Sequence, residues 1–173
     1  MIESIELLSA PPNAADLAEL HTLLRDSVEG GASVGFMLPL ADKVVADYWA
    51  GIFGDIAAGK RVLLVARAAG HIVGSVQLEL AQRPNSLHRC ELQKLLVLRS
   101  HRGQGLGTAL MHAAENHARL HRRSLIVLDT SATGNALSLY TRCGYTRLGT
   151  IPRYARDPDG PLIDTVIHYK ELS

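Results

Sequence analysis

The segment that most constrains the fold is a glycine-rich run near the middle of the chain, residues 102–108, RGQGLGT. An alternating stretch that is typical of a strand, 89–98, precedes it, and apolar residues at helical spacing follow it over about 106–121. Glycines at such a junction let main-chain N–H groups converge on one anion, and the helix N-terminus adds about half a positive charge. The run therefore predicts a pyrophosphate site between a strand and a helix.

Spacing separates this loop from two other phosphate-binding loops. The P-loop needs a Lys and then a Ser or Thr after its last glycine, whereas Gly107 is followed by Thr108 and Ala109. The dinucleotide fingerprint needs a third glycine three places after the second, where this chain has Thr108. The pattern that fits is Arg-x-x-Gly-x-Gly, at Arg102, Gly105 and Gly107. Taken alone, the run is also compatible with a turn that only caps a helix.

The rest of the chain predicts a mixed α/β (α+β) fold. Strands are expected over 2–8, 61–68, 71–80, 89–98, 124–128, 144–150 and 163–172, and helices from an Asn13 cap to Gly30 and over 40–58, 106–121 and 135–142. Residues 32–37 and 152–161 are expected to be loops. This order favours helices on both faces of a mixed sheet, in a single domain that spans 1–173.

Composition excludes several classes of protein. The formal charge is +1 with both signs interspersed, so no basic face for a nucleic acid is expected. No stretch approaches the ~20 apolar residues of a membrane span, and residues 1–6 lack the pattern of a signal peptide. Cys90 and Cys143 are expected to be reduced and buried, and the histidines have no metal-ligand spacing. We therefore expect a cytoplasmic protein with no metal and no nucleic-acid or membrane partner.

Three segments in order resemble the GNAT family of N-acetyltransferases. Leu95-Leu96-Val97 ends the strand before the loop, 102–108 matches the pyrophosphate loop of the family, and 136–140 with 143–145 match its Ala-x-x-Leu-Tyr and Gly-Phe segments. One position departs from the family pattern. Thr133 stands where the family often has an Asn that contacts the cofactor, and Asn135, two places later, is not counted as a ligand.

This resemblance implies a single-domain GNAT fold over 1–173, with a mostly antiparallel mixed sheet and a splayed central strand pair. It also implies acetyl-CoA as co-substrate and no metal. The residues expected to contact acetyl-CoA are Leu95, Leu96, Val97, Arg102, Gly103, Gln104, Gly105, Leu106, Gly107 and Thr108.

Two carboxylates are candidates for the general base that an amine acceptor requires, because an ammonium has no lone pair with which to attack. By period-two alternation, Glu91 shares a strand face with Gln93. The same alternation predicts Leu95 and Val97 on that face. Asp129 is expected at the end of the neighbouring strand, so that both carboxylates face one cleft and share the base role.

Each candidate group has a structural alternative. For Glu91 it is a salt bridge to Arg89 or Lys94, and for Asp129 a cap in the loop after its strand. Tyr140 stands where the family places its general acid, which would protonate the leaving thiolate, and its alternative is a packed core tyrosine. A main-chain N–H near Val97 is the candidate for holding the oxyanion.

The predicted function is acetyl-CoA-dependent N-acetylation of a small-molecule amine, by direct transfer through a tetrahedral intermediate. Segments outside the cofactor motifs, among them 30–37, 55–59 and 158–160, resemble a family member that acetylates a β-lactam amino-acid toxin. Acetylation of proteins or peptides, and a non-catalytic acetyl-CoA-binding module, are the alternatives. The sequence leaves the acceptor, the acyl chain and the oligomeric state open, a homodimer included.

Overall fold

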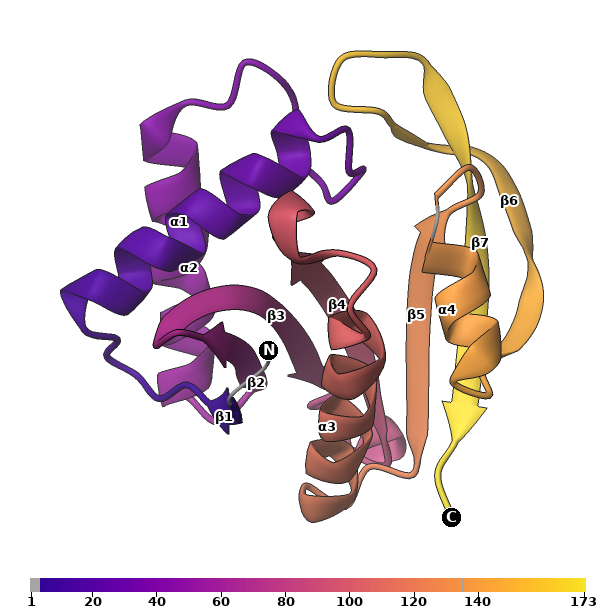
Figure 1. Cartoon of the computed structure of the whole chain (residues 1–173). Helices are drawn as coiled ribbons and strands as arrows, with labels where there is room; N and C mark the ends of the chain where they lie inside the picture. The colour runs from indigo at the N-terminus through magenta and orange to yellow at the C-terminus, as the bar shows by residue number, and fades with distance from the viewer. Residues whose placement is uncertain (1–3, 135) are drawn as a thin grey trace.

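A single mixed sheet organises the computed structural model, which describes residues 4–134 and 136–173 (Figure 1). The strands are β1 (Ser4–Leu7), β2 (Arg61–Ala68), β3 (His71–Leu80), β4 (Arg89–Val97), β5 (Leu125–Ser131), β6 (Thr146–Arg156) and β7 (Leu162–Glu171). The α-helices are α1 (Ala14–Glu29), α2 (Asp42–Ala57), α3 (Leu106–Leu120) and α4 (Ala136–Arg142), and two short 3-10 helices are η1 (Pro84–Ser86) and η2 (Arg99–His101). Residues 2, 3 and 135 of the predicted elements lie outside the described residues.

The seven strands lie in the order β1-β2-β3-β4-β5-β7-β6. Every neighbouring pair is antiparallel except β4 and β5, which run parallel. The sheet therefore consists of two antiparallel halves that meet at one parallel pair, and the predicted mixed, mostly antiparallel sheet is confirmed.

That central pair is joined only at its beginning. Residues 89–91 of β4 pair with 125–127 of β5, and no register partners follow in the described chain, although β4 continues to Val97 and β5 to Ser131. The two strands move apart toward the upper end in Figure 1. The predicted splay is confirmed, and beyond Glu91 the described part of β5 supplies no ladder partners to the main chain of β4.

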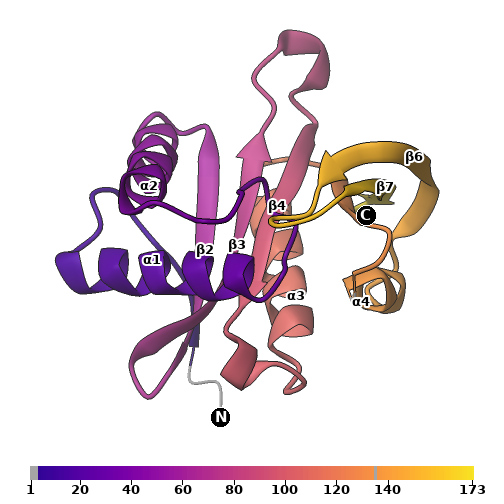
Figure 2. The same ribbon diagram turned by 90° about the horizontal axis from the view of Figure 1, so that it is seen from above.

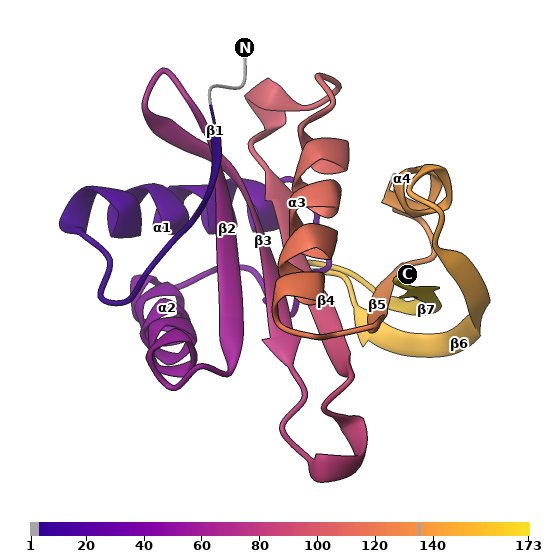
Figure 3. The same cartoon turned by 90° about the horizontal axis from the view of Figure 1, so that it is seen from below.

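Helices cover both faces of the sheet, as predicted. Residues Leu63 and Val65 of β2 pack against α1 and α2, whereas Leu64 and Ala66 pack in the core that contains α3 and α4. This division follows from the alternation of side chains along a strand. Accordingly, α1 crosses in front of β2 and β3 in Figure 2, and α3 lies in front of the strands in Figure 3.

Two predicted boundaries are wrong. The loop expected over 152–161 is shorter, because β6 continues to Arg156. Pro152 is tolerated because β6 is the edge strand and its register shifts between Ile151 and Ala155, so that no regular ladder hydrogen bond is required there. The strand expected over 124–128 is longer, since β7 pairs with β5 as far as Ser131.

Candidate active site

The glycine loop leads from η2 into α3. Gly103 and Gly105 have φ of +74° and +82°, a conformation that side chains rarely adopt, and a Cβ added at either would meet nothing within 4 Å. Ala109 N–H donates to the carbonyl of Gly105 (3.1 Å), so the amides at the start of α3 precede the first helical hydrogen bond. Unpaired amides at a helix start, beside two glycines with open space at their Cβ positions, are the type of group that binds a pyrophosphate.

The other residues of the loop have packing roles. A Cβ at Gly107 would lie 3.1 Å from Leu139 Cδ2, so this glycine lets α3 approach α4 closely. Arg102 Nε donates to the carbonyl of Val97 (3.0 Å), which ties the loop to the last residue of β4. The three glycines of the loop therefore serve two purposes, backbone conformation at Gly103 and Gly105 and helix packing at Gly107.

A contact with α1 holds the beginning of this loop. Asp26 accepts hydrogen bonds from the main-chain N–H and from Nε of Arg99, both at 2.8 Å. Burial raises the pKa of Asp26, but these hydrogen bonds and the Arg99 charge outweigh it and hold the pKa below its ordinary value. The first turn after β4 is thereby fixed to the helix that covers the opposite side of the sheet from α3.

A β-bulge interrupts β4 in the middle of the candidate site. Gln93 pairs with Gln77, but the next register pair along β4 is Leu96 with Ser75, so one extra residue is inserted. Lys94, at the bulge, has a φ of +49°. The alternation of side chains changes phase at this point.

The prediction that Leu95 and Val97 share the face of Glu91 is therefore wrong. Both pack against the core that contains α3, whereas Leu96 packs on the side of α1 and α2. Glu91 and Gln93 do share a face, as predicted, because their register partners are Glu79 and Gln77 on β3.

Hydrogen bonds hold Glu91 in a polar row across three strands. Gln93 Nε2 donates to Glu91 Oε1 (2.9 Å) and to Glu79 Oε2 (3.0 Å), so one amide bridges two carboxylates that lie opposite each other in the sheet. Arg61 donates to Gln77 (3.1 Å), Gln93 (2.9 Å) and Glu79 (3.0 Å). This cation offsets the repulsion that two facing carboxylates would otherwise cause. The predicted alternative for Glu91, a salt bridge to Arg89 or Lys94, is not among the ion pairs of the described residues.

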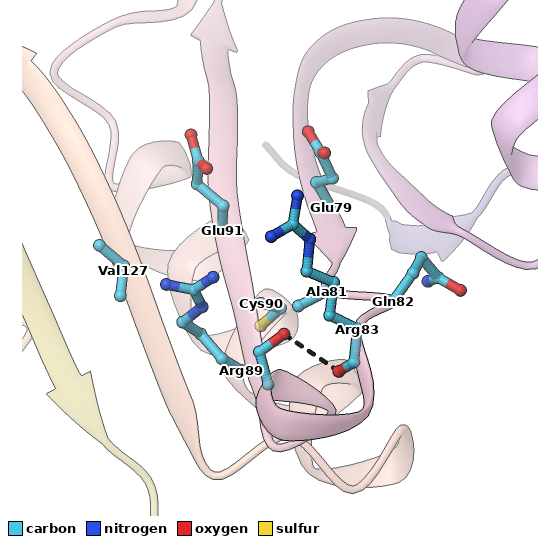
Figure 4. Close-up of a pocket in the computed structure, with 9 residues that line it drawn as sticks. Glu79, Ala81, Gln82, Arg83, Arg89, Cys90, Glu91 and Val127 are labelled. Atoms are coloured by element: carbon cyan, nitrogen blue, oxygen red, sulfur yellow. Dashed lines mark hydrogen bonds between the residues drawn. The ribbon is translucent and has the colours of Figure 1, made fainter.

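Glu91 also borders a cavity of about 240 Å³ where β3 and β4 meet their connecting loop. Figure 4 shows Glu79 and Glu91 extending in the same direction from neighbouring strands, with Arg83, Arg89 and Cys90 nearer the loop. The cavity opens beside the three residues that still pair β4 with β5. Glu91 is thus the last residue of the paired part of β4 and the first at the splay.

Lys94 is influenced by the charges of both candidate carboxylates. Its Nζ is 5.9 Å from the ring centroids of both Phe36 and Tyr48. Burial lowers the pKa of Lys94, the Asp129 charge raises it, the Arg61 charge lowers it and the Glu91 charge raises it, and the net effect is a pKa below the ordinary value. Charges on β4 and β5 therefore act on one ammonium group.

Asp129 lies within β5, opposite Ile167 of β7, and is exposed. The alternative of a cap in a loop after the strand is wrong, since the strand continues for two more residues. The charge of Asp129 acts on Tyr140 as well as on Lys94.

Tyr140 of α4 is 6% exposed and packs against two rings, Tyr145 and His168, at centroid distances of 6.1 and 5.7 Å. Burial raises the pKa of Tyr140 to about 12, the Asp129 charge adds to this, and a hydrogen bond with the Thr130 side chain opposes it. The hydroxyl is therefore protonated at neutral pH. The ring of Tyr140 is packed in the core, and its hydroxyl meets Thr130 of β5. A packed core tyrosine and a general acid, the two interpretations offered by the sequence, are therefore compatible.

Several residues of the site were missed by the sequence analysis. Phe36, Tyr48, Arg61 and Lys94 come from a loop, a helix and two strands, and no spacing in the sequence connects them. One signal was available for Lys94, because a lysine in the middle of an otherwise apolar strand end is costly to bury. Cys90 and Cys143 are free and buried, as predicted.

The loop after α1 is held against the connection between β6 and β7. Leu38 N–H donates to the carbonyl of Pro158 (2.8 Å) and the Ser33 hydroxyl to the carbonyl of Arg156 (3.4 Å). The two segments meet in the view of Figure 2. Phe36, within this loop, is in edge contact with Tyr48 at 5.1 Å. The loop thus covers the splayed end of the sheet on the side of α2.

Neither a metal site nor a membrane-spanning helix is present in the described residues. No group of three or more of their His, Cys, Asp and Glu side chains is arranged to hold a metal ion. Among the helices of 4–134 and 136–173, none combines the length and the apolar character needed to cross a membrane.

Comparison with known proteins agrees with this architecture. In solved structures, the chain superposes on a ribosomal-protein-alanine N-acetyltransferase of Brucella melitensis with a TM-score of 0.81 at 23% identity, over 98% of this chain and 100% of the other. It also superposes on yncA of Salmonella typhimurium, whose structure holds its cofactor acetyl-CoA, with a TM-score of 0.79 at 19% identity, over 99% and 95% of the two chains. Both likenesses concern the fold.

Sequence comparison extends further. The chain is 31% identical over 134 residues to an uncharacterized N-acetyltransferase encoded in the hisH-hisA intergenic region of Azospirillum brasilense, which covers 76% of each protein. The family model of the Acetyltransferase (GNAT) family matches residues 18–145, from α1 to the start of the last β-hairpin. The chain belongs to the GNAT family of acetyltransferases.

Proposed function

We propose that this chain transfers the acetyl group of acetyl-CoA to the amine of a small molecule, as a single domain over 1–173. The observation that carries the proposal is the end of pairing between β4 and β5 after Glu91, with the glycine loop at the same open end of the strands. This combination offers main-chain groups along β4 that β5 does not pair, and convergent amides beyond them. An extended chain that ends in a pyrophosphate matches both parts.

In this proposal the cofactor is held mainly by the backbone. The pyrophosphate lies at the amides that follow Gly103 and Gly105, and the pantetheine arm lies along the end of β4. The proposed contact residues are Leu95, Leu96, Val97, Arg102, Gly103, Gln104, Gly105, Leu106, Gly107 and Thr108. Gly107 contributes through helix packing, because a Cβ at this position would lie 3.1 Å from Leu139 Cδ2.

Glu91 and Asp129 are the proposed bases. The acceptor arrives as an ammonium and must lose a proton before its nitrogen can attack the thioester carbon. Both carboxylates lie at the splay and act on the same ammonium, that of Lys94, which is the type of charge that the acceptor would carry. Gln93 is a positioning residue, since its amide holds the Glu91 carboxylate in place.

Tyr140 is the proposed partner of the leaving sulfur. As the N–C bond forms and the C–S bond breaks, the electron pair of the C–S bond passes to sulfur. A hydroxyl whose pKa is about 12 stays protonated at neutral pH, so it donates a hydrogen bond to the developing thiolate. The sulfur takes the Tyr140 proton and coenzyme A leaves as the thiol, while the nitrogen gives up its second proton to solvent, which reprotonates Tyr140.

The cover formed by the loop after α1 supports a small acceptor over a protein. Its hydrogen bond from Leu38 to the β6–β7 connection spans the splayed end of the sheet, where an open peptide groove would have to run. Segments of this loop resemble tabtoxin resistance protein, so β-lactam amino acids belong among the acceptors to be tested. Peptides remain the second candidate class.

Release of free thiol from acetyl-CoA tests the proposal directly. The purified chain is assayed against amino acids, polyamines, β-lactam amino acids and peptides. Amine-dependent thiol release, with a mass increase of one acetyl group on the amine, supports the proposal. If acetyl-CoA binds and no amine is acetylated, the chain is a binding module and the proposed activity is wrong.

A further inference from the structure

Lys94 is a half-buried cation without a polar partner. Within residues 4–134 and 136–173, no hydrogen bond or ion pair involves its ammonium, which lies 5.9 Å from the centroids of the Phe36 and Tyr48 rings. Arg61, whose charge also acts on Lys94, is in contrast bonded to Gln77, Gln93 and Glu79. Burying an ammonium whose donors are unused is costly, because water is lost and nothing replaces it.

The backbone at Lys94 adds to this cost. A φ of +49° is unfavourable for a residue with a side chain, and such strain concentrates at functional sites. The Lys94 side chain reaches the loop between α1 and α2, residues 30–41, where a methyl group added at Gly35 would lie 3.9 Å from Nζ. Glycine or asparagine would fit this backbone better, so the lysine side chain itself is what the site requires.

The charges around Lys94 form a dipolar pattern. Two carboxylates, Glu91 on β4 and Asp129 on β5, act on the Lys94 ammonium, which has no ion-pair partner among the described residues. Both carboxylates and the faces of two rings favour the charged form of Lys94, which opposes the effect of burial on its pKa. An amine without a carboxylate would pair only with Glu91 and Asp129 and would leave the Lys94 ammonium without a partner.

We propose that Lys94 binds a carboxylate of the acceptor, so that the enzyme acetylates amines that carry a carboxylate in the same small molecule. This inference rests on the proposed acetyltransferase function and names its substrate class. The acceptor ammonium faces Glu91 and Asp129 while its carboxylate accepts hydrogen bonds from the Lys94 ammonium. Opposite charges at fixed positions also set the orientation of the amine toward the thioester, and they discriminate against amines that have no anion.

Pairs of substrates that differ only in the carboxylate test this inference. Lysine and cadaverine, histidine and histamine, and tyrosine and tyramine, together with the amino-acid amides, are compared by kcat/KM for thiol release. In the wild-type enzyme, amino acids are expected to exceed their decarboxylated partners by about 10- to 100-fold, the range for a hydrogen bond to a charged group. Equal rates within the pairs would overturn the inference and leave the proposed function intact.

Variants at Lys94 supply the second measurement. Lys94→Met keeps the length of the side chain and removes the charge, so the preference within each pair should fall to about onefold, mainly through KM of the amino acid. Lys94→Arg keeps the charge and should retain most of the preference. Lys60→Met, the same change at an exposed lysine, is the matched control and should leave the preference unaltered.

Calorimetry of acetyl-CoA separates the remaining outcomes. Unchanged acetyl-CoA affinity in Lys94→Met supports a role toward the acceptor, whereas a parallel loss assigns Lys94 to the cofactor and overturns the inference. If Lys94→Met does not fold, the wild-type pairs and Lys94→Arg still decide. Absence of thiol release with every amine contradicts the proposed function and the inference with it.

Discussion

The two sides of the splayed strand pair differ in the groups that they offer to a ligand: one offers mainly main-chain groups and the other mainly side chains. On the side proposed for the cofactor, the glycine loop offers main-chain amides, and its residues are contiguous in the sequence. On the side proposed for the acceptor, rings from a loop and from α2 lie near Lys94, and carboxylates of β4 and β5 act on its charge. A ligand shared by a whole family can be held by backbone geometry, whereas acceptor choice depends on side chains, which change without altering the fold.

Removing both carboxylates should cause the largest loss and tests the acceptor side. Glu91→Gln and Asp129→Asn are each expected to lower kcat about 100-fold, and the double variant about 1,000-fold, because groups that share one task are not additive. Acetyl-CoA affinity should stay constant if the two sides are independent. A single variant that melts earlier but turns over normally would remove that residue from the catalytic assignment.

Tyr140→Phe tests the group between the two sides. It keeps the ring packed against Tyr145 and removes the hydroxyl, so kcat should fall roughly 100-fold or less with little change in acetyl-CoA affinity. Since burial raises the pKa of Tyr140 to about 12, the phenol is protonated throughout the working range. The pH–rate curve should therefore show no loss from this group below about pH 10. Unaffected turnover would restrict Tyr140 to packing.

A bulky residue in the glycine loop should act on the cofactor side alone. Gly105→Val forces a β-branched side chain into a φ of +82° and places it in the space assigned to the pyrophosphate, so calorimetry should show acetyl-CoA affinity at least tenfold lower, about 1.4 kcal/mol. Gly149→Val is the control, since its Cβ also meets open space but its φ lies outside the left-handed region. Equal affinities in the two folded variants would contradict the assignment of the loop.

Asp26→Asn should give the smallest effect. Loss of the charge that holds Arg99 loosens the start of the loop, and KM for acetyl-CoA should rise roughly two- to fivefold, as expected for a partly exposed ion pair. The folded pKa of Asp26 lies below its unfolded value, so its stabilisation is present above about pH 4 and is lost as pH falls through the folded pKa. Acid melts of Asp26→Asn should accordingly be less steep than those of the wild type. Identical acid profiles would show that Arg99 does not depend on this carboxylate.

Much of the architecture was predicted from periodicity and turn residues. The glycine run, the strand before it and the helix after it lie where the spacing indicated, and the splay of β4 and β5 followed from the family resemblance. The predictions were wrong where the pairing of strands in the sheet outweighed a local sequence pattern. Pro152 suggested a loop, but an edge strand with a register shift accommodates it, and the bulge at Lys94 reversed the expected orientation of Leu95 and Val97.

The sequence by itself determined the conformation of the glycine loop, because backbone conformations with positive φ require glycine at particular positions and those positions are local. It also determined the candidates Glu91, Asp129 and Tyr140 as residue types. Only the tertiary structure decided that Lys94 lies near two rings, under the charges of two carboxylates and with no polar partner among the described residues. Its neighbours are distant in the chain, and one inserted residue in β4 sets the direction of its side chain. Local conformational rules can be read along a sequence, whereas the burial and pairing of a charge depend on which distant segments the fold brings beside it.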